Sequence, residues 1–212
     1  MKRTLEEHAA RFDEQADSYD GDSAPEYRAC ADLVIEHANL DAGDTVLDLG
    51  TGTGAIALAL APDAERVIGR DISEGMREQA RRKAVDRGLE TVEFGEGRFR
   101  KPNLPDGTDV DVVVSNFAMH HLSDAEKREA IETIAGLEPD RFVLGDVMFF
   151  GTPDPDEPFY SPDVDDPATV GTLADAFTDA GFALTAVERV HEQVGVLVAE
   201  GVPKRTPEED GR

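Results

Sequence analysis

Hydrophobic residues follow two patterns along the chain: short continuous runs, and longer segments with helical spacing. Short apolar runs predict strands at 46–49, 66–70, 91–94, 110–115 and 141–149, and the continuous run at 110–115 predicts burial on both faces of its strand. Helical spacing, capping residues and alanine-rich composition predict helices at 4–18, 25–38, 55–61, 73–87, 123–135 and 169–180. The last apolar segments, 182–190 and 194–199, predict an antiparallel hairpin. This alternation specifies an α/β fold with a seven-stranded, mostly parallel sheet.

Two connections depart from the alternation. Residues 101–107 are too short and too rich in proline for a crossover helix, so a loop is expected there. Residues 151–167 contain five prolines and many acids, which predicts an ordered surface loop. The predicted organisation is a single domain over 1–200, with 1–40 as an N-terminal helical cap and 201–212 as a flexible polar tail.

The strand at 46–49 leads directly into three alternate glycines, Gly50, Gly52 and Gly54, and then into a helix. Glycine there allows positive φ angles and lets a ligand approach the backbone closely. The free amides at the start of the helix favour an anionic group. Seventeen residues after Gly54, the next strand ends in Asp71, where a nucleoside-binding fold places its acceptor for ribose hydroxyls. Together these features predict a turn that binds a nucleoside.

The spacing of the glycines and one carboxylate narrow the choice of ligand. The pattern is G-x-G-x-G rather than the dinucleotide fingerprint G-x-G-x-x-G, and Asp48 stands two positions before the first glycine. A carboxylate there would repel a pyrophosphate but suits a ligand with an ammonium group. S-adenosylmethionine (SAM) carries both an amino acid end and a ribose, so it is the predicted cofactor.

Four segments together resemble the small class I SAM-dependent methyltransferases, of the kind that includes the ubiquinone and menaquinone C-methyltransferases. They are FDEQADSYD at 12–20, DLGTGTG at 48–54, the strand ending in Asp71 and DVVVSNFAMHHL at 111–122. The resemblance covers roughly residues 12–199. It implies a Rossmann-like class I methyltransferase fold and SAM as the cofactor, without specifying the methyl acceptor.

The residues expected to bind the cofactor are Tyr19, Asp48, Gly50, Thr51, Gly52, Gly54, Asp71, Ile72, Arg98, Phe99 and Asn116. The glycines shape the methionine pocket, Asp71 accepts hydrogen bonds from both ribose hydroxyls, and Ile72 covers one face of adenine. In the resembling family the N-terminal segment covers the cofactor with an aromatic residue, so Phe12 and Tyr19 are candidates. Ordinary packing of the N-terminal helix is the alternative for both.

One position departs from the pattern of the resembling family. Many relatives carry an acid after the third strand that accepts from the adenine amine, whereas this chain reads Glu96-Gly97-Arg98-Phe99. An arginine cannot accept a hydrogen bond. Either main-chain amides and stacking on Phe99 hold adenine, or Glu96 substitutes in a shifted register. A surface role is the alternative to cofactor binding for Arg98.

The candidates for chemistry follow the fourth strand, at the edge where parallel sheets bind ligands. Asn116 is expected to line the methyl site, and His120 or His121 to deprotonate or orient the acceptor. Adjacent histidines point in different directions, so at most one is expected to face the cleft. No metal site is predicted, because neighbouring residues rarely converge on one ion and no third ligand is evident. Possible walls of an acceptor pocket, with packing as the alternative, are Asp146, Met148, Phe159 and Tyr160.

The net charge of the chain bears on the ionic strength of the solution in which the protein works. The 46 acidic and 21 basic residues give a net charge of -25. Molar salt screens such self-repulsion, since the Debye length at 1 M is about 3 Å. We therefore expect a halophilic archaeon as the source, with an acidic mesophilic protein as the alternative. The same charge argues against nucleic acid as a partner.

The remaining features point to a cytoplasmic protein. The single cysteine, Cys30, excludes an internal disulfide. The sequence shows neither an apolar run that could cross a bilayer nor an apolar signal core at its start, so no membrane partner is expected. The predicted function is a SAM-dependent methyltransferase acting on a small molecule. The alternatives are a catalytically silent SAM-binding regulatory or scaffold protein and a nicotinamide oxidoreductase; the oligomeric state is not specified.

Overall fold

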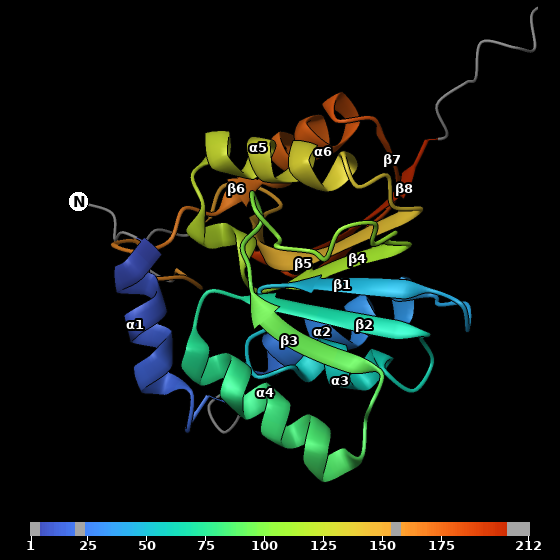
Figure 1. The fold of residues 1–212 in the computed structure, drawn as a ribbon. Helices are drawn as coiled ribbons and strands as arrows, with labels where there is room; N and C mark the ends of the chain where they lie inside the picture. Colours follow the sequence, from blue (N-terminus) through green and yellow to red (C-terminus); the bar gives the residue numbers. More distant parts are fainter. Residues whose placement is uncertain (1–4, 20–23, 154–157, 203–212) are drawn as a thin grey trace, which may run out of the picture.

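The computed structural model describes residues 5–19, 24–153 and 158–202, which form one central sheet with helices on both faces (Figure 1). The strands are β1 (Thr45–Leu49), β2 (Arg66–Asp71), β3 (Val92–Glu96), β4 (Val112–Asn116), β5 (Arg141–Phe149), β6 (Ala168–Thr169), β7 (Phe182–His191) and β8 (Val194–Gly201). The helices are α1 (Leu5–Gln15), α2 (Pro25–Ala38), α3 (Ala55–Leu60), α4 (Glu74–Arg87), α5 (Asp124–Ala135) and α6 (Val170–Asp179), with one 3-10 turn, η1 (Met119–His121). Helices α5 and α6 cover one face of the sheet, and α2, α3 and α4 cover the other.

The sheet has the strand order β3-β2-β1-β4-β5-β8-β7, with the short strand β6 paired to β5 off this path. Strand β8 runs antiparallel to both of its neighbours, whereas the other pairs are parallel. The predicted mostly parallel sheet with a C-terminal antiparallel hairpin is therefore confirmed. Strand β6 and the turn η1 were not predicted, because two or three residues are too few to show a hydrophobic period.

Strand β1 lies where the order of the strands reverses, since it pairs with β2 on one side and with β4 on the other. The crevice outside the carboxyl ends of the strands at such a point is where open α/β sheets bind ligands. Gly50 follows β1, Asp71 ends β2 and Asn116 ends β4. The topology therefore brings these three residues to one edge of the sheet.

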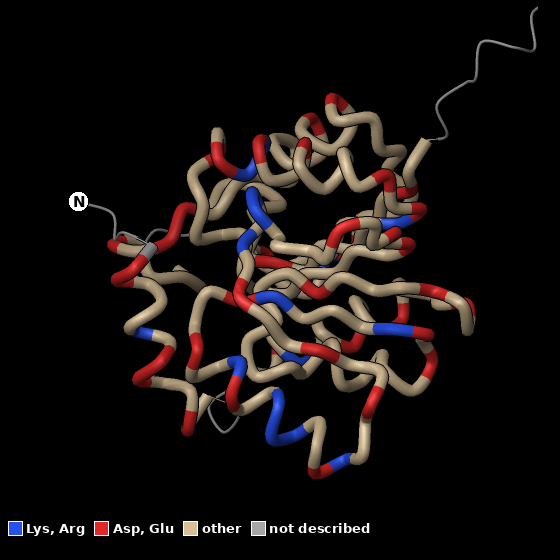
Figure 2. Tube along the Cα trace, in the orientation of Figure 1, with Lys and Arg blue, Asp and Glu red and all other residues tan. Residues whose placement is uncertain are grey.

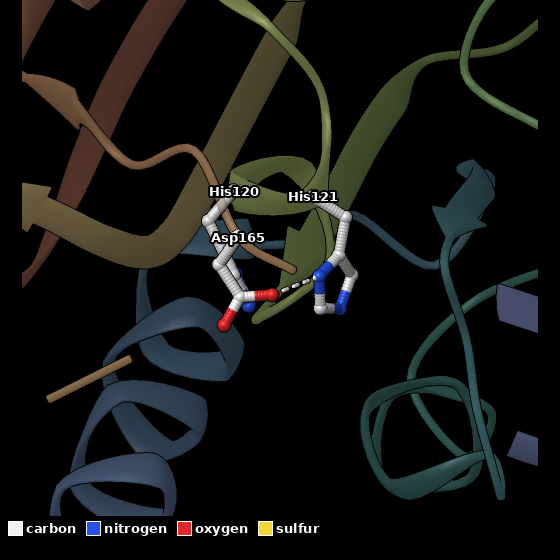
Figure 3. Close-up of side chains that lie close together, drawn as sticks. All are labelled: His120, His121 and Asp165. Atoms are coloured by element: carbon white, nitrogen blue, oxygen red, sulfur yellow. Dashed lines mark hydrogen bonds and ion pairs between the residues drawn. The ribbon is translucent and has the colours of Figure 1, made fainter. Parts of the chain in front are cut away.

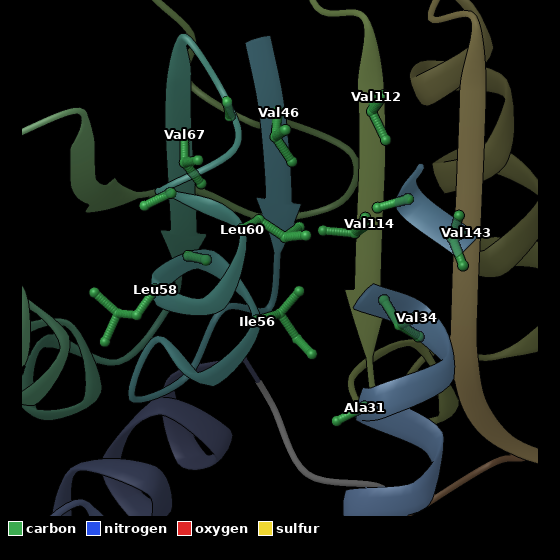
Figure 4. Packing of buried hydrophobic residues seen from close by; sticks show 14 of the residues in the cluster. Ala31, Val34, Val46, Ile56, Leu58, Leu60, Val67, Val112, Val114 and Val143 are labelled. Atoms are coloured by element: carbon green, nitrogen blue, oxygen red, sulfur yellow. The ribbon is translucent and has the colours of Figure 1, made fainter. Parts of the chain in front are cut away.

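Buried hydrophobic residues form two clusters, one on each face of the sheet. Val46 and Val112 belong to the cluster covered by α2 and α3 (Figure 4). Leu47 belongs to the opposite cluster, which also holds Phe142 and Phe177 with their ring centroids 4.9 Å apart. Successive residues of a strand point to opposite faces, so Val46 and Leu47 contribute to different clusters. This two-sided burial explains why the strands read as continuous apolar runs.

Helix α1 is fastened to the start of α4. The carboxylate of Asp13 accepts hydrogen bonds from the N–H of Gly75 at 2.9 Å and from the hydroxyl of Ser73 at 2.5 Å. A carboxylate at this position complements the partial positive charge of a helix N-terminus. These contacts hold α1 at the same sheet edge as Asp71. Helix α1 ends at Gln15, earlier than the predicted residue 18, and a turn follows.

The connections agree in part with the expectations. Residues 97–111 form a loop without a helix between β3 and β4, as predicted. Strand β4 begins two residues later than predicted, because Asp111 uses its carboxylate to accept from the N–H of Thr45 at 2.8 Å. Helix α5 begins with a capping box, in which Ser123 and Glu126 each bond to the backbone of the other. Residues 154–157 of the acidic loop and the tail from 203 lie outside the described residues, so those expectations stay predictions.

Candidate active site

A cavity lies at the carboxyl edge of the sheet, next to β1, β2 and β4. Nine of the predicted site residues line it: Tyr19, Gly50, Gly52, Asp71, Ile72, Arg98, Phe99, Asn116 and His121. The remaining predicted site residues, Asp48, Thr51, Gly54 and His120, are buried and do not line it. Histidine His8 and the aromatic residues Phe12, Tyr27 and Phe117 complete much of the wall. The cavity therefore joins the predicted cofactor turn to the predicted catalytic segment.

Gly50 occupies the part of the turn that requires glycine. Its φ angle is +72°, and an added Cβ would lie 2.3 Å from the Cβ of Ala118. Its N–H donates to the carbonyl of Arg70 at 2.8 Å, which ties the turn to β2. The turn presents bare backbone to the cavity, so a ligand can approach the main chain without meeting a side chain.

Asp48 and Thr51 hold this turn from behind. One oxygen of the Asp48 carboxylate accepts from the Thr51 hydroxyl at 2.6 Å and from the N–H of Ala57 at 3.2 Å, while the other has no hydrogen-bond partner among the residues that the structure describes. Burial raises the pKa of Asp48 to about 7, although these two hydrogen bonds oppose the shift. Asp48 is 1% exposed, so direct contact with the ammonium group of SAM does not fit this position. A contact through water stays a prediction.

The carboxylate of Asp71 is held by two backbone donors and still faces the cavity. One oxygen accepts from the N–H of Gly52 at 2.9 Å, and the other accepts from the N–H of Ser73 at 2.9 Å. Burial raises the pKa of Asp71, and the two hydrogen bonds offset part of the rise. A carboxylate has about four lone-pair positions, so each oxygen can accept a further hydrogen bond. Such a group can receive a pair of hydroxyls.

The loop after β3 supplies the wall near Asp71. Arg98 and Phe99 line the cavity, whereas Glu96 is exposed and does not. The backbone of Arg98 pairs with that of Lys101, and its exposed guanidinium has no hydrogen bond or ion pair within the described residues. Of the two predicted ways to hold adenine, stacking on Phe99 fits this geometry. Acceptance by Glu96 does not, because its side chain lies outside the lining.

The end of β4 carries the two most unusual positions of the site. Asn116 is 6% exposed, and neither its amide nitrogen nor its amide oxygen has a hydrogen-bond partner among the described residues. The next residue, Phe117, has a φ of +54°, which is strained for a bulky side chain. Buried polar atoms without partners and strained backbone both concentrate at functional sites. Asn116 is therefore able to bind a polar group that enters the cavity.

The two adjacent histidines of η1 have different surroundings. His120 is buried, and its Nδ1 lies 2.5 Å from a carboxylate oxygen of Asp146 while its backbone N–H donates to the other oxygen at 2.9 Å. His121 lines the cavity, and its Nδ1 lies 2.7 Å from a carboxylate oxygen of Asp165 (Figure 3). At most one of the two histidines was expected to face the cleft, and His121 is the one that lines it. Asp146 does not line the cavity but fixes His120.

Asp165 was not singled out by the sequence, yet the structure holds it firmly. Its second oxygen accepts from the N–H of Ser161 at 2.8 Å. The neighbouring residue Asp166 donates its N–H to the carbonyl of His120 at 2.7 Å, and its carbonyl accepts from the ammonium group of Lys127. Lys127 is 3% exposed and also donates to the carbonyl of Leu122 at 2.6 Å. The acidic loop is thus fastened to η1 and α5 beside the cavity.

Aromatic rings surround the histidines in a closed series of contacts. The neighbours in this series are Phe12, Tyr19, Tyr27, Phe117, His120, His121 and again Phe12, with centroids 4.1 to 6.5 Å apart. The predicted wall residues Met148, Phe159 and Tyr160 do not line the cavity. Met148 is fully buried in the core, Phe159 packs on Phe117, and Tyr160 packs on Phe149. For these three the packing alternative holds.

His120, His121 and Asp165 also place three potential metal-ligand atoms within 4.8 Å of one another. We do not assign them as ligands, because the Nδ1 of His121 and an oxygen of Asp165 are already bonded to each other at 2.7 Å. The Nδ1 of His120 is likewise taken by Asp146.

Within the described ranges, none of the helices is both long and apolar enough to cross a membrane.

The sheet order, the glycine turn and the carboxylate that ends β2 define the Rossmann-like class of nucleoside-binding enzymes. Comparison with known proteins identifies the family. Residues 46–137 match the family model described as a methyltransferase domain. An uncharacterized methyltransferase of Bacillus pumilus is 32% identical over 151 residues, which cover 68% of this chain and 68% of the relative. One from Geobacillus is 34% identical over 147 residues, which cover 68% of this chain and 66% of the relative.

Structural comparison gives the same answer. The crystal structure of a SAM-dependent methyltransferase from Aquifex aeolicus aligns with a TM-score of 0.62 and 25% identity, over 81% of this chain and 89% of that one. The chain therefore belongs to the methyltransferase-domain family, and its cofactor is SAM. Family membership decides against a nicotinamide oxidoreductase. The chain spans about two thirds of the length of the two curated relatives.

Proposed function

We propose that the protein transfers the methyl group of SAM to a small molecule that has a proton to lose and binds beside His121. The observation that carries this proposal is the position of His121. Its ring lines the same cavity as Gly50 and Asp71, and Asp165 holds its Nδ1 at 2.7 Å. The cavity lies beneath α1 and within aromatic walls, which favours a small acceptor over a macromolecule.

Bound SAM supplies an electrophilic methyl group on a positively charged sulfur. In our proposal the turn at Gly50 and Gly52 receives the amino acid end, and Asp71 accepts hydrogen bonds from the ribose hydroxyls. Ile72 and Phe99 pack on adenine, with Arg98 at the rim. The site fits the cofactor because Gly50 and Gly52 line the cavity without side chains, with positive φ angles, and because Asp71 keeps free acceptor positions.

Asn116 and the aromatic residues of the cap border the place where the acceptor would bind. The amide of Asn116 offers an NH2 group that can donate and an oxygen that can accept, and neither has a partner in the described chain. Tyr19 and Phe12 cover the cavity from the N-terminal segment. Exclusion of water by these rings strengthens every polar interaction within the site. A dry, shaped cavity is what transfer from an already activated donor chiefly requires.

His121 acts as the general base in this proposal. The Nε2 of neutral His121 takes the proton of the acceptor, while the Asp165 carboxylate stabilises the resulting imidazolium through Nδ1–H. The acceptor atom forms its new bond to the methyl carbon, and the electron pair of the broken carbon–sulfur bond stays on sulfur. The products are the methylated acceptor and S-adenosylhomocysteine. His120 has no such role, because its Nδ1 and backbone N–H are both committed to buried Asp146.

Turnover of methyl-labelled SAM with fractionated metabolite extracts tests the proposal. His121→Gln should lower the rate by about 100- to 10,000-fold, the range of general base catalysis, with the affinity for SAM unchanged within about twofold. His37→Gln, in a histidine paired with Glu188 at 2.8 Å and outside the cavity, is the matched control. Full activity of His121→Gln would exclude His121 as the base. SAM binding without S-adenosylhomocysteine formation would favour the regulatory or scaffold alternative, which the unusual Arg98 also supports.

We further propose that the protein works in a salt-rich cytoplasm of a halophilic archaeon, close in type to the ubiquinone and menaquinone C-methyltransferases. Acidic residues are spread over helices, strands and loops, and basic residues are fewer (Figure 2). The chain as a whole carries a net charge of -25. Dissolved cations at high concentration would screen this repulsion.

A further inference from the structure

The two histidines of η1 differ in their surroundings, and this difference bears on the protonation state of the proposed base, His121. The rings of His120 and His121 have centroids 4.1 Å apart, with an interplanar angle of 49°. His120 is 6% exposed, and both its ring and its backbone N–H bond to Asp146. His121 instead faces the cavity and bonds to Asp165. One ring is therefore enclosed with a counter-charge, and its neighbour is open to the acceptor.

We propose that His120 is a fixed imidazolium whose charge keeps the neighbouring His121 neutral and able to accept a proton. This inference rests on the proposed role of His121 as the base. His120 touches neither cofactor nor acceptor, so it is a positioning residue that acts through His121. The proposal gives the buried Asp146 a function as well, because its carboxylate retains the proton on His120.

The charges around His120 agree with this assignment. Burial by itself lowers the pKa of His120. The charge and the hydrogen bond of Asp146 on β5 raise this pKa, the charge of Asp165 adds to the rise, and together they outweigh the effect of burial. Lys127 on α5 opposes them, although its ammonium group is turned to the carbonyls of Leu122 and Asp166. The pKa of His120 ends above its ordinary value. Protonated His120 therefore persists to a higher pH than an ordinary protonated histidine does.

The charges around His121 act in the opposite sense. Burial lowers the pKa of His121, and the charge of His120 lowers it further, against the smaller effects of Asp165 and Asp146. His8 on α1 also faces it, with ring centroids 5.1 Å apart. Two similar groups whose surroundings move their pKa values apart are a mark of divided acid and base roles. Such a pair titrates in coupled steps, so both rings must be followed together.

Histidine titrations by NMR test the proposal directly on the full chain. The sample is ¹³C-labelled at the imidazoles, saturated with S-adenosylhomocysteine, and kept in molar KCl with EDTA so that no metal contributes. His121→Gln and His120→Gln assign the two resonances by their loss. We expect His121 to titrate below His120 in the unmodified protein. In His120→Gln the His121 titration should rise by about one pH unit or more, since a unit charge about 4 Å away acts strongly in a poorly hydrated site.

A second variant protects the test against failure of His120→Gln to fold. In Asp146→Asn the ring of His120 stays but loses its counter-charge, so its own titration should fall by about one unit or more. His37→Gln should leave both titrations unchanged. A His121 titration that does not move in His120→Gln, or a His120 that titrates below His121 in the unmodified protein, would overturn the proposal.

Kinetics separate this proposal from the proposed function. In His120→Gln the acid limb of the pH profile of kcat/KM should shift to higher pH, by the same number of pH units as the His121 titration. If the titration moves while activity does not depend on His121, the electrostatic coupling stands and the base assignment fails. If activity requires His121 but the His121 titration is the same in His120→Gln as in the unmodified protein, the assignment of His121 as the base stands and the proposed electrostatic coupling between the two histidines fails.

Discussion

The two halves of the cavity are built in different ways. The cofactor half is made largely of backbone: the turn at Gly50 and Gly52, tied to β2, with Asp71 held by two main-chain N–H groups. The half proposed to bind the acceptor, here called the acceptor half, is made of side chains from distant parts of the chain, such as Phe12 on α1, His121 on η1 and Asp165 in the acidic loop.

This difference indicates which half of the cavity tolerates amino-acid substitution. A backbone cradle depends on glycine and on the register of two neighbouring strands, so few substitutions preserve it. Side chains that meet across 44 residues, as His121 and Asp165 do, can be exchanged without changing the sheet. A family built this way keeps one cofactor and changes its acceptor.

The largest expected effect involves both halves at once. In dilute buffer the net charge of -25 is unscreened, so we expect the free energy of unfolding to fall and the fold to be lost. Thermal melts between low and multimolar KCl measure this. Both halves should disappear in one transition, because they share one sheet. A melting temperature independent of KCl would contradict the proposed salt requirement.

The next largest effect is expected at the turn. Gly50→Ala places a Cβ 2.3 Å from Ala118 at a φ of +72°. Strain at such positions costs about 1–3 kcal/mol before the overlap is counted, so SAM affinity should fall by at least about tenfold. Gly43→Ala is the matched control, since its Cβ would meet nothing within 4 Å. Equal affinities of the two variants, measured by calorimetry, would break the account of the backbone cradle.

A similar but smaller loss is expected at the end of β2. Asp71→Ala would leave two ribose hydroxyls without an acceptor, which should weaken SAM binding by about 1–3 kcal/mol. Asp86→Ala, in an exposed residue of α4, should have no effect on binding. Calorimetry with SAM and with S-adenosylhomocysteine should show the same loss for both ligands. Unchanged binding would remove Asp71 from the cofactor site.

The smallest effect should be confined to the acceptor half. Lys127→Met leaves the carbonyls of Leu122 and Asp166 without their buried donor and should loosen Asp165. We expect a fall in kcat of about tenfold with SAM affinity unchanged within about twofold. Arg128 lies on α5 with Lys127 and forms an exposed ion pair with Asp179 on α6, so Arg128→Met is the control. A larger effect on SAM affinity than on kcat would contradict the separation of the two halves.

The cofactor half was largely predictable from the sequence because its signals are local. Gly50 and Asp71 stand at fixed distances from short apolar runs, and those runs fix the strands. The acceptor half was less accessible. In the sequence, Asp165 is one of 46 acidic residues and Lys127 is one of 21 basic residues, and nothing sets either apart. Their roles depend on contacts that form only when the acidic loop packs against η1 and α5. The surroundings of Asp48 were hidden for a similar reason, because sequence spacing does not show that its carboxylate bonds to Thr51 and Ala57 behind the turn.

Calorimetry on purified, salt-stabilised protein tests the central claim most directly, namely that the turn at Gly50 and the carboxylate of Asp71 together bind an adenosyl amino acid. SAM, S-adenosylhomocysteine and NAD are titrated side by side. We predict saturable binding of the first two and none of NAD. Absence of binding of both SAM and S-adenosylhomocysteine to the folded protein would contradict the account.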